Sequence, residues 1–173
     1  MSITARTTIR GGKLAVLAGP EIKVGQKAPD FRLQANDETD VRLSDSRGKV
    51  RVLSVVVSLD TPVCDLQTQR FEEEAARFHD VIIYTISMDL PFAQARYCGA
   101  HSIKNLQTLS DHRDASFGLA YGVLMEGVRL LSRAIFIVDA NDFVRYVEYV
   151  PETSRHPDYE KAIAALKRVV SAE

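Results

Sequence analysis

The chain has 173 residues, 46% of them hydrophobic and 26% charged, which suits one folded domain and excludes a disordered segment. Its 22 basic residues nearly balance its 23 acidic ones. Without a basic excess, nucleic acid and anionic membrane surfaces are disfavoured as partners, and a small neutral partner or substrate is favoured.

The chain is predicted to begin with a β-hairpin and to continue into alternating strands and helices. Gly11 and Gly12 mark the hairpin turn, and the hairpin forms an extension over residues 1–18 of a single domain spanning 1–173. The strongest strand is 50–57, an almost continuous β-branched run typical of a strand buried on both faces. The strands expected in this first half are 7–10, 14–17, 30–33, 41–43, 50–57 and 81–86.

Two helices are expected around these strands. Thr61 as N-cap and Pro62 as first helical residue begin a helix that runs to about Phe78. A second helix begins at Pro91 and is expected to stop near Gly99, since glycine commonly ends helices.

The second half of the chain is predicted to add a hairpin and two further helices. These elements are a strand at 106–109, a short helix at 115–121, hairpin strands at 133–138 and 143–150 joined by a turn at 139–142, and a last helix from 157 to about 170. The order of elements predicts an α/β fold of the thioredoxin-like type, with a mixed central sheet flanked by helices.

Each of the two cysteines can be interpreted either as redox-active or as a small buried residue. The chain lacks the apolar stretch of a secretory signal and any run of the roughly 20 apolar residues that span a membrane, so we expect a cytoplasmic protein whose thiols are reduced. Cys64 falls at the third position of the helix that begins at Pro62, where free backbone N–H groups and the helix dipole stabilise a thiolate. Taken alone, Cys64 would be interpreted as a small buried residue, and the same interpretation is open for Cys98.

The sequence resembles the bacterial thiol peroxidases, which are atypical two-cysteine peroxiredoxins. The resemblance rests on Ser58-Leu59-Asp60-Thr61-Pro62-Val63-Cys64 with Gln69-Arg70-Phe71, and on Asp89-Leu90-Pro91-Phe92-Ala93-Gln94 with Tyr97-Cys98-Gly99. It extends from Gly25–Phe31 through Ser132-Arg133-Ala134 to the helix around Pro157–Glu160 and covers nearly the whole chain.

The resemblance implies a role for four residues. Cys64 becomes the cysteine that attacks a hydroperoxide, Cys98 the cysteine that resolves the sulfenic acid as an intramolecular disulfide, and Thr61 and Arg133 complete the pocket. Thioredoxin as reductant and a homodimer are implied in the same way. Without the resemblance, Arg133 would be interpreted as an exposed charge at a strand end.

Val57 is the one departure from the pattern. Peroxiredoxins usually carry a proline four residues before the threonine, and valine there favours continuing the strand, which puts the shape of the loop and the rate in question. The four histidines are scattered, so we expect no metal site, and no cofactor is indicated.

Two other functions compete with the peroxidase interpretation. The cysteines are 34 residues apart, from 64 to 98, so the Cys-x-x-Cys motif of a thiol-disulfide oxidoreductase is missing. The other alternative is a peroxide sensor or interaction protein that keeps the fold without turnover, for which Val57 is the best argument.

Overall fold

The computed structural model describes residues 5–173, so the first four residues of the expected N-terminal extension lie outside the described part. The strands are β1 (Thr7–Arg10), β2 (Lys13–Ala18), β3 (Arg32–Gln34), β4 (Asp40–Arg42), β5 (Val50–Val55), β6 (Val81–Ser87), β7 (Gln107–Ser110), β8 (Leu124–Met125), β9 (Leu130–Leu131), β10 (Ala134–Val138) and β11 (Val144–Tyr149). The helices are α1 (Pro62–Arg77), α2 (Pro91–Ala100), α3 (Ser116–Ala120) and α4 (Tyr159–Ser171), with a 3₁₀ turn, η1 (Leu43–Ser46).

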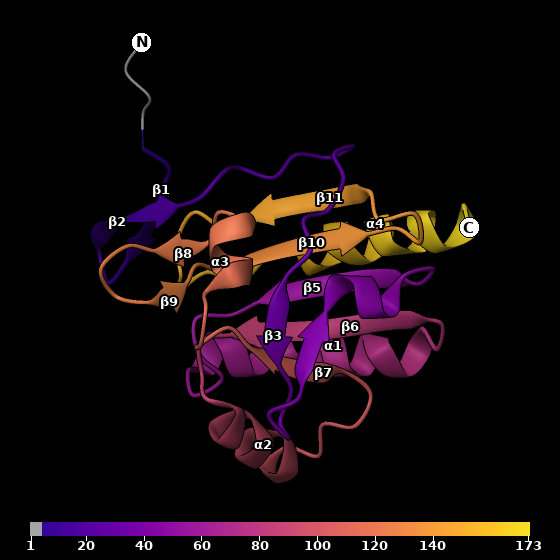
Figure 1. Cartoon of the computed structure of the whole chain (residues 1–173), viewed down its shortest axis with the longest axis horizontal. Helices are drawn as coiled ribbons and strands as arrows, with labels where there is room; N and C mark the ends of the chain where they lie inside the picture. The colour runs from indigo at the N-terminus through magenta and orange to yellow at the C-terminus, as the bar shows by residue number, and fades with distance from the viewer. Residues whose placement is uncertain (1–4) are drawn as a thin grey trace.

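The central sheet is mixed, as the order of elements predicted. Its strand order is β11-β10-β5-β6-β7-β3-β4, in which β5, β6 and β7 run parallel and β10 runs antiparallel to both β5 and β11. Every residue of β5 is buried, in keeping with its β-branched composition and central place. The thioredoxin-like α/β prediction is thereby confirmed, and Figure 1 shows the helices arranged around this sheet.

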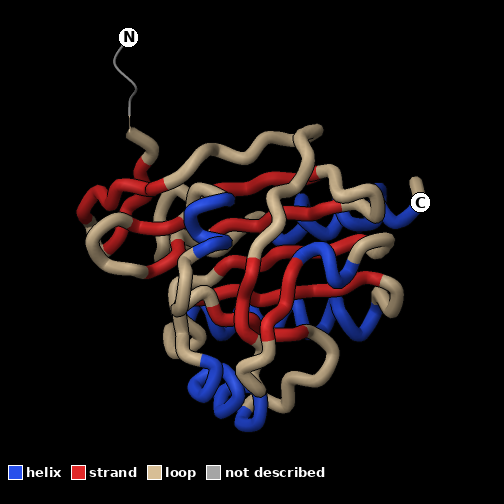
Figure 2. The backbone as a smooth tube through the Cα atoms, viewed as in Figure 1, coloured by secondary structure: helices blue, strands red, loops and turns tan. Residues whose placement is uncertain are grey.

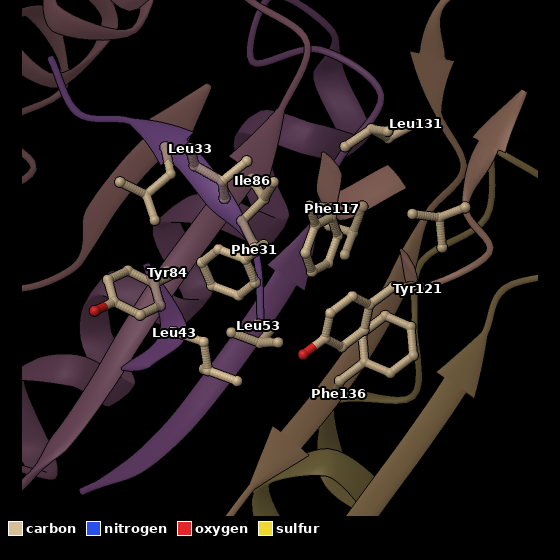
Figure 3. Packing of buried hydrophobic residues seen from close by; sticks show 14 of the residues in the cluster. Phe31, Leu33, Leu43, Leu53, Tyr84, Ile86, Phe117, Tyr121, Leu131 and Phe136 are labelled. Atoms are coloured by element: carbon tan, nitrogen blue, oxygen red, sulfur yellow. The ribbon is translucent and has the colours of Figure 1, made fainter. Parts of the chain in front are cut away.

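Each face of the sheet has its own apolar core. α1 and α4 cover one face, seen behind the sheet in Figure 2, and Phe71 and Leu166 from these helices pack on Val52 and Ile135 of the strands. The other face carries the larger cluster shown in Figure 3, in which the Phe117 and Tyr121 rings stack at 4.4 Å between centroids. These two layers bury β5 from both faces at the centre of the molecule.

The N-terminal hairpin forms part of a second, four-stranded sheet that the sequence did not indicate. Its strand order is β1-β2-β8-β9, and β8 and β9 contain two residues each, too few to show any hydrophobic period. Gly11 and Gly12 make the β1–β2 turn at positive φ, as their composition predicted. On its other side, β1 contacts the segment after β11, where Ile9 N–H donates to the Pro151 carbonyl at 2.9 Å.

α2 begins at Pro91 and ends near Gly99, as predicted, although glycine does not form its cap. Gly99 lies inside the helix, which continues to Ala100, and Ser102 takes the left-handed conformation with φ 55°. Ile103 N–H then donates to the Cys98 carbonyl at 3.0 Å, the bond that closes a Schellman cap. Gly99 thus located the end of the helix to within one residue, while Ser102 takes the positive φ of the cap that closes the turn carrying Cys98. Within residues 5–173, no helix is long and apolar enough to cross a membrane.

Candidate functional site

Cys64 lies at the carboxyl end of the central strand, in the first turn of α1. Strand β5 ends at Val55, two residues earlier than predicted, so Val57 belongs to the loop and does not prolong the strand. The Cys64 side chain has 0% exposure and packs with Val56, Leu59 and Tyr97. The backbone N–H groups of Val63 and Cys64 in this first helical turn have no acceptor within the helix and provide positive potential around the sulfur.

Arg133 directly contacts this sulfur. Ala134 pairs with Val55 in the antiparallel β10–β5 ladder, so the residue before Ala134 is brought beside the end of β5. The Arg133 Nη2 atom lies 3.3 Å from Cys64 Sγ, and the side chain is 1% exposed. The alternative interpretation of Arg133 as an exposed charge at a strand end is therefore wrong. A buried guanidinium beside a thiol stabilises the thiolate over the neutral form.

Two acceptors that the sequence did not single out orient the guanidinium. Arg133 Nη1 donates to Gln67 Oε1 at 2.7 Å, while Nε and Nη2 donate to the Thr153 carbonyl at 3.2 and 2.6 Å. Gln67 is itself fixed by donating to Ser54 Oγ at 2.8 Å. Gln67 follows Cys64 by three residues on α1, a spacing that signals a shared helix face, whereas nothing local marks the Thr153 carbonyl.

The N-terminal hairpin supports the Thr153 carbonyl. Thr153 N–H donates to the Ile9 carbonyl of β1 at 2.9 Å, and Ile9 forms a bridge with Glu152. The hairpin therefore holds the loop after β11, and through it the Arg133 side chain, in register with Cys64.

Thr61 occupies the N-cap position but does not act through its side chain as a cap. Its backbone is extended, with φ −126° and ψ 147°, yet its hydroxyl donates to the Ser58 carbonyl at 2.9 Å. The N-cap prediction is correct, but the Thr61 side chain accepts no hydrogen bond from the first helical turn, and its hydroxyl donates within the loop before α1. No hydrogen bond joins the Thr61 hydroxyl to Cys64 among the described residues.

Cys98 lies in the last turn of α2, half-buried, and neither cysteine is in a disulfide. The turns carrying the two cysteines are joined by their neighbours: Tyr97 donates its hydroxyl to Asp65 Oδ1 at 2.6 Å. The His101 ring stacks on Tyr97 at 4.1 Å between centroids, with Nε2 at 3.6 Å from the same carboxylate oxygen. We call Asp65, Tyr97 and His101 the inter-helix clasp.

The clasp shifts the acidity of two of its members. Burial would raise the pKa of Asp65, but hydrogen bonds from Tyr97 and Gln69, with His101 nearby, outweigh it and hold that pKa below its usual range. Burial, and then the Asp65 carboxylate, raise the pKa of Tyr97 well above its usual value. At neutral pH the clasp thus joins a neutral phenol to a carboxylate, a charge-assisted hydrogen bond.

A cavity of about 480 Å³ opens beside the clasp. It lies between the loop before α1 and one side of α2, and its lining includes Ser58, Asp60, Arg96, Tyr97 and His101. Cys64 is not among the lining residues and is fully covered, so a molecule in the cavity does not contact the sulfur in this conformation. Within residues 5–173, no group of three or more His, Cys, Asp or Glu side chains is placed to hold a metal ion.

The clasp is expected to restrain opening of the end of α2. Tyr97→Phe removes one partly exposed hydrogen bond to a carboxylate, worth about 1 kcal/mol, and should speed amide hydrogen exchange across residues 95–101 about fivefold. Tyr84→Phe is the matched control, since Tyr84 is 3% exposed and its hydroxyl makes no hydrogen bond among the described residues. Equal exchange in both variants would show that the clasp does not hold the helix end.

Comparison with known proteins agrees with the geometry. The Redoxin family model matches residues 23–163. A thiol peroxidase of Halalkalibacterium halodurans is 56% identical over 94% of this chain and 98% of its own length, and one of Bacillus subtilis is 54% identical over 96% and 99%. A crystal structure of a peroxiredoxin-like protein from Aquifex aeolicus, 39% identical, superposes with a TM-score of 0.89 over 95% of this chain and 98% of that one.

Proposed function

The chain belongs to the bacterial thiol peroxidases of the Redoxin family, enzymes that reduce peroxides with a thiol, and we propose that Cys64 is its peroxidatic cysteine and Cys98 its resolving cysteine. The observation that carries the proposal is the 3.3 Å contact between the buried Arg133 guanidinium and Cys64 Sγ at the N-terminus of α1. This contact supports the proposal because a cation beside a thiol sulfur favours the thiolate that attacks the peroxide.

The first step is attack of the Cys64 thiolate on one oxygen of a hydroperoxide. The S–O bond forms as the O–O bond breaks, leaving Cys64 as sulfenic acid and the second oxygen as an alkoxide or hydroxide that takes up a proton. Negative charge moves from sulfur to the leaving oxygen, so donors that reach both atoms stabilise the transition state. Arg133 and the free N–H groups of the first α1 turn fill this role, and Thr61 adds its hydroxyl if that hydroxyl turns from the Ser58 carbonyl.

The second step is condensation of the sulfenic acid with the Cys98 thiol. An S–S bond forms, and the sulfenic oxygen leaves as water with the thiol proton, so two electrons have passed from the cysteine pair to the peroxide. A disulfide requires Cα atoms about 4.4 to 6.8 Å apart, yet each cysteine is held in a folded helical turn and the clasp lies between them. Local opening of the α1 start, the α2 end or both therefore precedes the disulfide.

Thioredoxin is the reductant we propose: its dithiol is oxidised to a disulfide as the Cys64–Cys98 disulfide returns to two thiols. We also propose a homodimer, for which the large exposed side chains of Leu66, Leu90 and Phe92 around the two helices are the supporting observation. A cytoplasmic location stays a prediction from the sequence.

A coupled assay tests the proposal against both competing functions. With thioredoxin, thioredoxin reductase and NADPH, the wild-type protein should consume hydrogen peroxide and an organic hydroperoxide over many turnovers. A peroxide sensor would stop after one equivalent, and a thiol-disulfide oxidoreductase would reduce insulin disulfides without peroxide. Absence of turnover with any reductant would reject the proposed cycle.

A further inference from the structure

We infer that Asn36 and Thr108 hold the Cys98 thiol in a closed ring of hydrogen bonds, and that this ring controls how readily Cys98 leaves its folded position. The inference rests on the proposed function, in which Cys98 is the resolving cysteine. Asn36 and Thr108 act through the position of Cys98 and are positioning residues.

The ring joins three segments that are far apart in the sequence. Cys98 comes from the last turn of α2, Thr108 from the second position of β7, and Asn36 from the turn between β3 and β4. Thr108 Oγ1 lies 3.3 Å from Cys98 Sγ, Thr108 donates to Asn36 Oδ1 at 2.8 Å, and Asn36 Nδ2 donates to Cys98 Sγ at 3.7 Å. Thr108 is 1% exposed, so water does not compete for its hydroxyl.

The direction of each hydrogen bond follows from the number of hydrogen atoms. The Thr108 hydroxyl has a single hydrogen, which it gives to Asn36 Oδ1, so the 3.3 Å contact leaves Cys98 S–H as the donor to Thr108 Oγ1. Each of the three side chains then donates once and accepts once within the ring. A closed cycle of this kind is complete only while Cys98 is a thiol in its folded position, and hydrogen bonds in a cycle strengthen one another.

The ring places a cost on the resolving step. Cys98 must leave both partners before its sulfur can reach the Cys64 sulfenic acid, and its departure removes the donor to the buried Thr108 Oγ1 and the acceptor of the Asn36 Nδ2 group. While Cys98 remains in the ring, a second peroxide can oxidise Cys64 from sulfenic to sulfinic acid. The stability of the ring therefore determines which fraction of the Cys64 sulfenic acid forms the disulfide and which fraction is oxidised further to sulfinic acid.

The test measures release of Cys98 without peroxide, in a Cys64→Ser background in which Cys98 is the single cysteine. The rate of iodoacetamide labelling is expected to rise about fivefold in Thr108→Val and in Asn36→Ala, the effect of losing one hydrogen bond. Because both residues belong to one ring, the double variant should label no faster than the faster single variant, within about twofold. Thr108→Ser, which keeps the hydroxyl, should label like the parent.

Thr85→Val is the matched control. Thr85 pairs with Thr108 across the β6–β7 ladder, has the same 1% exposure, and its hydroxyl has no hydrogen-bond partner in the part of the chain that the structure describes. Thr85→Val changes packing and β-propensity as Thr108→Val does, but it removes no hydrogen bond between described residues. If Thr108→Val labels no faster than Thr85→Val, or if the effects of Thr108→Val and Asn36→Ala simply multiply in the double variant, the ring is overturned.

A second readout separates this inference from the proposed function. In proteins that retain Cys64, a pulse of excess hydroperoxide should give about fivefold less sulfinic acid in Thr108→Val than in Thr85→Val, measured by intact mass. Equal sulfinic acid in the two variants would contradict control of over-oxidation by the ring. Faster labelling of Cys98 with no disulfide in any variant would instead refute Cys98 as the resolving cysteine while leaving the ring in place.

Discussion

Cys64→Ser is expected to abolish peroxide reduction, with a loss in rate on the order of 10³-fold or more, because a serine hydroxyl at the same position is not ionised and cannot replace the thiolate as nucleophile. Serine is nearly isosteric with cysteine, and Cys64 makes no covalent bond, so the fold should survive. Peroxide consumption with a chemical dithiol and with thioredoxin measures the effect.

Cys98→Ser serves as the paired variant. It should still reduce one equivalent of peroxide, since Cys64 and Arg133 remain, and should then accumulate Cys64 sulfenic and sulfinic acids in place of a disulfide. Unimpaired turnover by Cys64→Ser would contradict the assignment of the two cysteines. Failure of Cys98→Ser to reduce even the first equivalent of peroxide would contradict it as well.

Arg133→Lys is expected to lower the rate of Cys64 oxidation about 100-fold, the effect of removing one well-placed donor from a developing anion. Lysine keeps the positive charge but cannot donate at once to Gln67, the Thr153 carbonyl and Cys64, as the guanidinium does. The rate of Cys64 oxidation, measured by stopped flow with limiting peroxide, should fall in this variant. The alkylation rate of Cys64 at neutral pH should fall as well.

A buried arginine elsewhere in the same sheet separates chemistry from stability. Arg51 is 0% exposed, pairs with Asp142, and faces Val138 at the opposite end of the β5–β10 ladder from Arg133. Arg51→Lys should lower the free energy of unfolding by about 1 to 3 kcal/mol, much as Arg133→Lys does, while the folded protein keeps its peroxidase rate. An equal loss of peroxidase rate in Arg51→Lys and Arg133→Lys would show that Arg133 has only a structural role.

The layout of the fold followed from local patterns along the chain. The run from Val50 predicted the central strand because a strand covered on both faces is apolar throughout, and Thr61-Pro62 located the start of α1 to the residue. The three-residue strands β3 and β4 were predicted in this way, but the two-residue strands β8 and β9 were not. β8 and β9 exist because they extend the N-terminal hairpin into a sheet, a tertiary contact with no local signal.

The site shows the same division between local and long-range information. Cys64 at a helix N-terminus is visible in the sequence, and the resemblance supplied Arg133, but the burial of Arg133 follows from the register of β10 against β5. The contacts of the Thr153 carbonyl with Arg133 and of Thr153 with Ile9 involve backbone atoms, so the residue types in the sequence do not predict them. Val57 was expected to lengthen the strand, yet the chain leaves β5 at Val55 and Val57 packs beside Cys64 and Tyr97.

The most direct test of the catalytic cycle is a peptide map of the reduced protein after exposure to one equivalent of hydroperoxide and rapid alkylation. Cycling through both cysteines predicts one disulfide between Cys64 and Cys98 within a single chain, with loss of two hydrogen atoms from the intact mass. A Cys64 sulfinic acid beside an alkylated Cys98, or disulfides that join two chains, would contradict it.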